Sequence, residues 1–218
     1  MVRTMDENTN YLVISLGFFL AIILLSALFI KPSDVLGKIS IEEQPLQKVT
    51  ELQVKPGERY LYEYKISEPE KLTTTLAYQI KKGNGCTILE VDQGTNKSGV
   101  CIDKYGNDES KSNVSLAKPF FYIFYPWMLA VNEDFNWQIY VFTHVPTKVP
   151  MSEVQFTTIK REQLFGRDAY KVLVMNKGRS SNQTISRWID IEKRILLKEA
   201  GENYEVVLIE APFPLNKT

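Results

Sequence analysis

The chain has 218 residues, and its 26 basic and 26 acidic side chains give a formal net charge of zero. Hydrophobic residues make up 44% of the sequence and charged residues 24%, which is typical of a protein with a folded core. The balanced charge and the lack of a basic stripe argue against a nucleic-acid partner.

The first predicted element is a membrane span over residues 11–30, which contain no charged side chain. A helix rises about 1.5 Å per residue, so this segment is long enough to cross the hydrocarbon core of a bilayer. No small-x-small cleavage pattern follows it, which favours an uncleaved anchor over a signal peptide. We therefore expect a cytoplasmic tail over residues 1–10, an anchor over 11–30 and a stalk, rich in Pro, Lys and Glu, over 31–58.

The basic residues beside the span do not decide its orientation, because Arg3 stands against Lys31 and Lys38 on the other side. The glycosylation sequons give a direction instead, since all of them follow the span and such acceptors mark exposed loops of exported domains. The sequence thus predicts a single-pass protein of the cell membrane whose domain over residues 59–218 is extracytoplasmic. The predicted glycosylation sites are Asn96, Asn113, Asn182 and Asn216.

The chain contains two cysteines, Cys86 and Cys101, and one histidine, His144. A structural zinc site needs four Cys or His ligands in close pairs, and these three residues provide neither the number nor the spacing. A nucleophilic cysteine needs a base, and His144 lies in an alternating apolar run that is typical of a strand. We predict no metal site and no catalytic cysteine.

A disulfide between Cys86 and Cys101 is the favoured interpretation. Both cysteines lie in β-branched runs on either side of turn-forming residues, which predicts a hairpin. A hairpin centred between Gln93 and Gly94 places the two cysteines directly opposite each other, close to the spacing that a disulfide requires. The alternative is a pair of buried free thiols, which behave as small hydrophobic side chains.

From Arg59 onward the sequence has the period-two pattern of strands joined by tight turns, which predicts an antiparallel meander. Turn signals occur at residues 82–85, 165–168, 191–194 and 201–203. One face of such a sheet is apolar and has to be covered by another element. The predicted strands are RYLYEYKI, KLTTTLAYQI, CTILEVD, SGVCID, FNWQIYVFTHV, EVQFTTIKREQL, DAYKVLVMN, TISRWIDI, RILLKEA and YEVVLIEA.

The aromatic segment over residues 117–131 is the expected cover. Pro119 suits the start of a helix, whereas Pro126 would kink or split one. Its apolar residues point to all sides, so the segment either packs as core under the sheet, lines a hydrophobic cavity or touches the membrane interface. The candidate residues for a hydrophobic ligand are Phe120, Phe121, Phe124, Trp127 and Met128.

The C-terminal half resembles the LolA-like lipoprotein-carrier superfamily. The resemblance rests on Gly166 with Tyr170-Lys171-Val172, on Trp188-Ile189-Asp190 with Leu197-Lys198, and on an opening strand over residues 54–66. It implies a mainly β fold of the α+β class, in which a strongly curved antiparallel half-barrel covers one or two helices around a hydrophobic interior. With the N-terminal transmembrane helix, the chain would be a membrane-anchored variant of that fold.

Members of this superfamily handle acyl chains, so the resemblance implies a non-catalytic protein that holds a lipid or another hydrophobic ligand. The alternative is a structural or interaction subunit of a cell-envelope complex, with an envelope protein as its partner. Asp190 and Glu192 could form a carboxylate pair, but Asp at a hairpin turn is favoured for its backbone hydrogen bonds. No phosphate-binding loop and no hydrolase motif occurs, and we expect no cofactor.

Overall fold

The computed structural model describes residues 39–46, 50–67, 71–93, 96–106, 123–144, 147–178 and 182–216. The chain divides into two compact units, one made of Met1–Ser40 and Phe142–Pro150 and the other of Ile41–Val141 and Met151–Thr218. The predicted tail and the predicted span over residues 11–30 lie outside the described ranges. Within those ranges, no helix is long and apolar enough to cross a membrane.

The described strands form an antiparallel sheet with the order β1-β6-β7-β8-β9-β10-β11-β2-β3-β4-β5. Two meanders, β2 to β5 and β6 to β11, are joined where the last strand pairs with β2. The strands are β1 (Ile39–Glu43), β2 (Arg59–Ile66), β3 (Leu72–Lys82), β4 (Thr87–Gln93), β5 (Asn96–Ile102), β6 (Asn136–His144), β7 (Lys148–Leu164), β8 (Arg167–Gly178), β9 (Asn182–Asp190), β10 (Leu196–Ala200) and β11 (Tyr204–Glu210).

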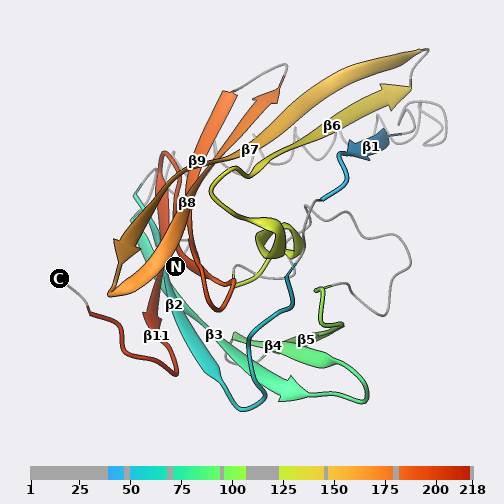
Figure 1. The fold of residues 1–218 in the computed structure, drawn as a ribbon. Coiled ribbons are helices and arrows are strands. Elements are labelled where there is room, and N and C mark those ends of the chain that lie inside the picture. The colour runs from blue at the N-terminus through green and yellow to red at the C-terminus, as the bar shows by residue number, and fades with distance from the viewer. Residues whose placement is uncertain are drawn as a thin grey trace, which may run out of the picture. The chain divides into compact units, whose positions relative to one another are not determined.

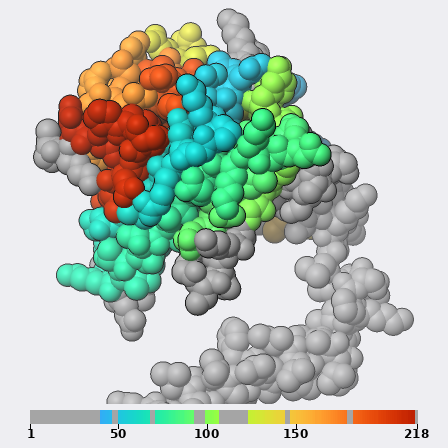
Figure 2. Space-filling view, turned by 90° about the horizontal axis from the view of Figure 1, so that it is seen from below, coloured from blue at the N-terminus to red at the C-terminus, as the bar shows by residue number. Residues whose placement is uncertain are grey.

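The junction between the two meanders is a regular antiparallel pair. Tyr204 lies opposite Ile66, and Val206 lies opposite Tyr64. Figure 2 shows the red surface of β11 beside the blue-green surface of β2. The first strand of one meander and the last strand of the other therefore meet within the sheet.

The strands of the larger unit bury alternate residues, as their period-two pattern requires. In β2, Tyr60 and Tyr62 are fully buried, whereas Arg59 is exposed. Tyr62 packs edge-on against Tyr78 of β3 with ring centroids 5.5 Å apart, and its hydroxyl donates to the carbonyl of Leu196 (2.6 Å). The buried side of the sheet is called the inner face below, and the opposite side the outer face.

The prediction of an α+β fold with one or two helices under the sheet is wrong. The only helical element of the described residues is a five-residue 3-10 helix, η1 (Pro126–Ala130), within the segment 123–135. This segment lies on the inner face of the sheet (Figure 1). It is fixed by backbone hydrogen bonds, which Leu196 donates to Ile123 (2.9 Å) and Thr158 donates to Phe135 (2.9 Å). An irregular chain segment, buried over residues 123–131, therefore takes the place of the predicted helices.

Cys86 and Cys101 form a disulfide, as predicted, but the predicted register of their hairpin is wrong. Gln93 pairs with Asn96, so the residue opposite Cys101 is Ile88. Cys86 lies two positions before Ile88 and therefore on the same side of the hairpin. The disulfide joins these diagonal neighbours, whose Cα atoms are 5.7 Å apart.

Part of the predicted stalk packs against the domain. The backbone N–H groups of Thr50 and Leu52 donate to the carbonyls of Leu129 and Lys104, both at 2.9 Å. Val54 is only 9% exposed and belongs to the hydrophobic core. Residues 50–58 thus form an extended layer that holds η1 against the sheet.

Candidate functional site

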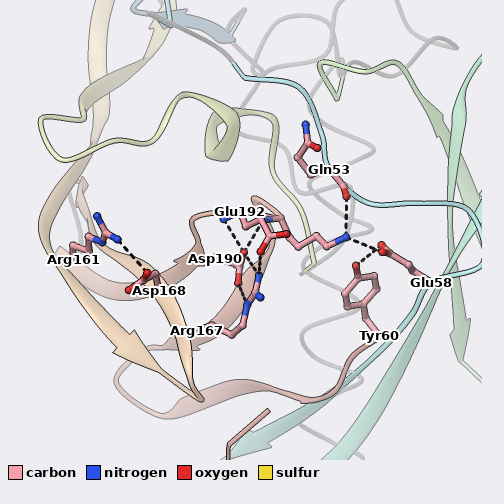
Figure 3. Close-up of polar contacts among 9 residues, drawn as sticks. Gln53, Glu58, Tyr60, Arg161, Arg167, Asp168, Asp190 and Glu192 are labelled. Carbon is pink, nitrogen blue, oxygen red and sulfur yellow. Dashed lines mark hydrogen bonds and ion pairs between the residues drawn. The ribbon is translucent and has the colours of Figure 1, made fainter. Parts of the chain in front are cut away.

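A polar cluster surrounds the turn between β9 and β10 (Figure 3). Asp190 is fully buried, and Arg167 at the start of β8 binds both of its carboxylate oxygens, at 2.7 and 3.0 Å. The backbone N–H groups of Glu192 and Lys193 also donate to Asp190, at 2.9 and 2.6 Å. Asp190 therefore caps the turn, as the sequence predicted, and Glu192 adds a second contact to Arg167 (3.0 Å).

Lys193 connects this turn to the layer that precedes β2. Its ammonium group contacts Glu58 at 2.8 Å and the carbonyl of Gln53 at 3.1 Å. The hydroxyl of Tyr60 donates to the same carboxylate at 2.7 Å. Burial alone would raise the pKa of Glu58, but the hydrogen bonds from Lys193, Tyr60 and the backbone of Lys55 lower it below its usual value.

Two further groups of the cluster, Tyr60 and Arg167, have pKa values that move away from neutrality. Burial and the bond to Glu58 raise the pKa of Tyr60 far above neutrality, and the contact with Asp190 raises the pKa of Arg167. A general acid or base works best with a pKa near the working pH, and these shifts lead away from it. Asp168, which follows Arg167 beside the β7–β8 turn, accepts hydrogen bonds from Arg161 (3.1 Å) and Gln163 (2.5 Å).

A second polar group lies on the inner face, among core side chains. Arg187 of β9 is opposite Glu199 of β10, and its Nε donates to the carboxylate at 2.6 Å. The guanidinium also lies over the ring of Tyr125, 4.4 Å from its centroid, and the hydroxyl of Tyr204 donates to Glu199 at 2.6 Å. Arg187 and Glu199 are 9% and 2% exposed, so this is an ion pair in the protein interior.

The surroundings of the pair shift the pKa values of two groups. Burial lowers the pKa of Arg187, but Tyr125 and Glu199 together raise it above its ordinary value. Burial and the hydrogen bond to Glu199 raise the pKa of Tyr204. The contact of Arg187 with Tyr125 holds the segment 123–135 on β9 and β10.

The residues predicted to bind a hydrophobic ligand are core residues wherever the structure describes them. Phe124 is 1% exposed, and Trp127 and Met128 are fully buried. The ring of Trp127 packs on Phe156 and Phe135, with centroids 4.9 and 5.9 Å apart. Phe120 and Phe121 lie outside the described residues.

Phe124, Trp127 and Met128 line none of three hollows at the surface of the described residues. One, of about 460 Å³, lies between the turn at Gly57 and strands β3 and β4, and its lining includes Arg59, Lys81 and Glu90. Another, of about 390 Å³, is lined by residues that include Phe135 and Trp137. A third, of about 240 Å³, lies beside Tyr204.

The predicted sequons are only partly within the described residues. Asn182 and Asn216 are exposed, and Asn96 begins β5. Asn113 falls outside the described ranges. The use of these sites stays a prediction.

A further set of side chains gathers on the outer face. Register places Lys160 of β7 opposite Lys171 of β8, then Trp188 of β9, then Lys198 of β10, in one row across four strands. The two ammonium groups nearest Trp188, of Lys171 and Lys198, lie 4.6 and 5.6 Å from its ring centroid. We call this row, together with Ile159, the Trp188 patch.

The positions of the buried charges are indicated by strand alternation and not by a sequence motif. Arg187 has the same parity in β9 as the buried Ile189, and Glu199 the same parity in β10 as the buried Leu197. Alternation alone therefore assigns both charges to the inner face. The Trp188 patch needs the register of four strands, and a β-bulge at Ile159 changes that register.

No family model matches the chain, and no curated protein matches it. Among solved structures, one similar to it comes from Bacteroides fragilis and is described as a candidate exported protein with a YmcC-like fold. It has 8% identity and a TM-score of 0.38 over 76% of this chain and 100% of that one. Another, described as a candidate lipoprotein from Parabacteroides distasonis, has 11% identity with the same coverage and TM-score. The LolA-like resemblance stays a prediction.

Proposed function

We propose that the larger unit is a non-catalytic, extracytoplasmic interaction module that binds a protein partner through its outer surface. The observation that carries this proposal is the filled inner face, where Trp127, Met128 and Leu129 are all fully buried by the chain itself. A protein that held a lipid against these side chains would need space beside them. The alternative predicted from the sequence, an interaction subunit, requires no such space.

The disulfide between Cys86 and Cys101 supports the extracytoplasmic location. Disulfides persist in oxidising compartments and are rare where thiols are kept reduced. The polar clusters support a non-catalytic role, because their charged groups form ion pairs and hydrogen bonds that hold strands, turns and the segment 123–135 together. Exposed side chains of the outer face are therefore the candidates for binding a partner.

Photo-crosslinking in the native cell tests this proposal on the full chain. A photoreactive phenylalanine analogue is placed in turn at two outer-face positions of β7, Ile159 and Met151, which are 48% and 40% exposed. We expect at least one position to give a discrete protein adduct. The control position is Glu202, which is exposed in the β10–β11 turn.

Native mass spectrometry of the same protein, purified in detergent, tests the competing role. An interaction module gives the mass of the bare chain after incubation with phospholipid. A co-purifying acyl-chain species, with no protein adduct from any position, would overturn the proposal in favour of lipid binding.

A further inference from the structure

The Trp188 patch contains an arrangement that a free, solvent-facing sheet does not favour. Lys160 and Lys171 stand directly opposite each other on β7 and β8. Side chains in this position have Cβ atoms about 4.5–5.5 Å apart, and like charges so placed repel each other. The repulsion is relieved when an anionic group lies between the two ammonium groups.

The chain itself supplies only part of that negative charge. Lys160 forms an ion pair with Glu162, and Lys198 forms one with Glu205. Among the residues that the structure describes, no carboxylate forms an ion pair with Lys171. Glu162 is further engaged by Trp188, whose indole N–H donates to it at 2.6 Å. Glu162 attracts Lys171 without forming an ion pair with it, so Lys171 is the cation of the patch whose counter-charge is least complete.

An apolar side chain lies exposed beside the two lysines. Ile159 is the extra residue of a β-bulge, inserted where the pairing shifts between Thr158 and Lys160. The bulge leaves it on the surface, 48% exposed, next to Lys160. Bulges re-aim side chains at sheet surfaces, so the patch combines an aliphatic contact, an aromatic ring and a row of cations.

The patch fits a polypeptide better than a membrane. Trp188 is partly buried, its N–H is bound to Glu162, and its ring faces two ammonium groups, so it is not free to insert into a bilayer. The net charge of the chain is zero, which gives no long-range attraction to an anionic surface. Glu162 and Glu205 would also repel a uniformly anionic surface, whereas a peptide can place its carboxylates between them.

We propose that the Trp188 patch docks an acidic segment of a partner protein, with a carboxylate between Lys160 and Lys171 and an apolar side chain against Ile159. This inference rests on the proposed interaction role and names the partner's chemistry. Lys171 carries the electrostatic part of the contact, and Ile159 carries the apolar part.

The test measures binding of a labelled ten-residue peptide of eight glutamates and two leucines to the full chain by fluorescence anisotropy. We expect saturable binding that weakens at least tenfold in Lys171→Glu and several-fold in Ile159→Asp. Lys81→Glu is the control, because Lys81 is an exposed strand lysine outside the patch; the affinity of this variant for the peptide should change less than twofold. A peptide with lysine in place of glutamate should bind the Lys160→Glu/Lys171→Glu double variant better than it binds the unaltered protein.

Equal binding by the unaltered protein and Lys171→Glu would overturn the docking surface. If the protein binds vesicles in which about one third of the lipid is phosphatidylserine and does not bind the peptide, the docking surface is also overturned in favour of a lipid surface. A crosslink from Met151 but none from Ile159 would refute this surface and leave the interaction role intact. No protein adduct from either position would refute the interaction role itself.

Discussion

Arg187 and Glu199 face each other across neighbouring strands and form a nearly solvent-free ion pair, 2.6 Å long, beneath the ring of Tyr125. The pair fastens an irregular segment of chain to the inner face of a sheet. Charges in such a place lose their hydration, so each depends on the other. Several measurable consequences arise from this and from the other contacts described above.

We expect Glu199→Gln to lower the free energy of unfolding by about 3–5 kcal/mol, because it leaves Arg187 buried without a counter-charge. The double variant Arg187→Met/Glu199→Leu should lose much less, since both buried charges are then removed together. Urea unfolding followed by tryptophan fluorescence measures both. The exposed pair Lys81 and Glu90 is the control, and its Lys81→Met/Glu90→Leu variant should change stability by about 1 kcal/mol or less. A double variant as unstable as Glu199→Gln would contradict this account.

Trp127 gives a test of the filled inner face. Trp127→Ala should cost about 3–5 kcal/mol of stability, the usual loss for a large aromatic removed from a core. Trp127→Phe should cost far less, because the indole N–H has no hydrogen-bond partner among the described residues and phenylalanine retains the packing on Phe156. Thermal unfolding of both variants distinguishes a core residue from a cavity wall. If Trp127→Ala is as stable as the unaltered protein, the residue does not pack as described.

The disulfide should contribute to stability through the loop that it closes. Cys86 and Cys101 are 15 residues apart, and a loop of this length predicts a loss of about 3 kcal/mol in Cys101→Ser. Reduction of the unaltered protein with dithiothreitol should reproduce that loss under the same urea titration. Intact mass after alkylation, with and without reduction, confirms the state of the thiols in each sample. Unchanged stability on full reduction would show that the β4–β5 hairpin is held by its other contacts.

The contact between Glu58 and Lys193 predicts a dependence of stability on pH. The pKa of Glu58 is lower in the folded protein than its ordinary value of 4.5. Its contribution is therefore fully present above that value and is lost as the pH falls through the folded pKa. Glu58→Gln should cost about 1.5–3 kcal/mol near neutral pH, the usual range for a hydrogen bond to a charged group.

The same variant should lose stability less steeply than the unaltered protein below pH 4.5. Urea unfolding in a series of buffers on both sides of that pH measures the difference between the two slopes. Glu90→Gln is a suitable comparison, because it removes a carboxylate from an exposed pair. If the free energy of unfolding falls equally steeply below pH 4.5 in Glu58→Gln and in the unaltered protein, the role assigned to Glu58 is refuted.

The strands of the larger unit could be predicted because their signal is local. The predicted strand over residues 59–66 coincides with β2, and the predicted strands from 71 to 211 correspond to β3 through β11. Turn chemistry was equally readable, since Gly166 and Arg194 have positive φ values of 76° and 59° in the predicted turns. The strand β1 was missed, because it lies within a polar segment that resembles a stalk.

The segment around η1 could not be predicted in the same way. Its aromatic residues indicated burial correctly, but burial does not distinguish a helix from an extended segment covered on all sides. The conformation of the segment depends on Pro126 and on the contacts with Phe156 and Arg187. Both contacts come from strands that are distant in the sequence. Long-range packing therefore overrides the local pattern here.

The register of the hairpin that carries the disulfide was predicted wrongly for a different reason. Its register depends on which two residues form the turn, and several neighbouring Gly, Asn and Lys residues suit a turn. A shift of the centre by one residue changes every cross-strand pair. The cysteines still meet, because diagonal neighbours on one face are within reach of each other.

The position of β11 between β10 and β2 sets the order in which the domain can be completed during synthesis. The strands β2 to β5 leave the ribosome first, yet the neighbour that covers one side of β2 is among the last segments to be made. Until then β2 has an open edge, with unpaired backbone groups available to other chains. A nascent chain stalled before Tyr204 should consequently depend on chaperones, and release of the final residues should end that dependence.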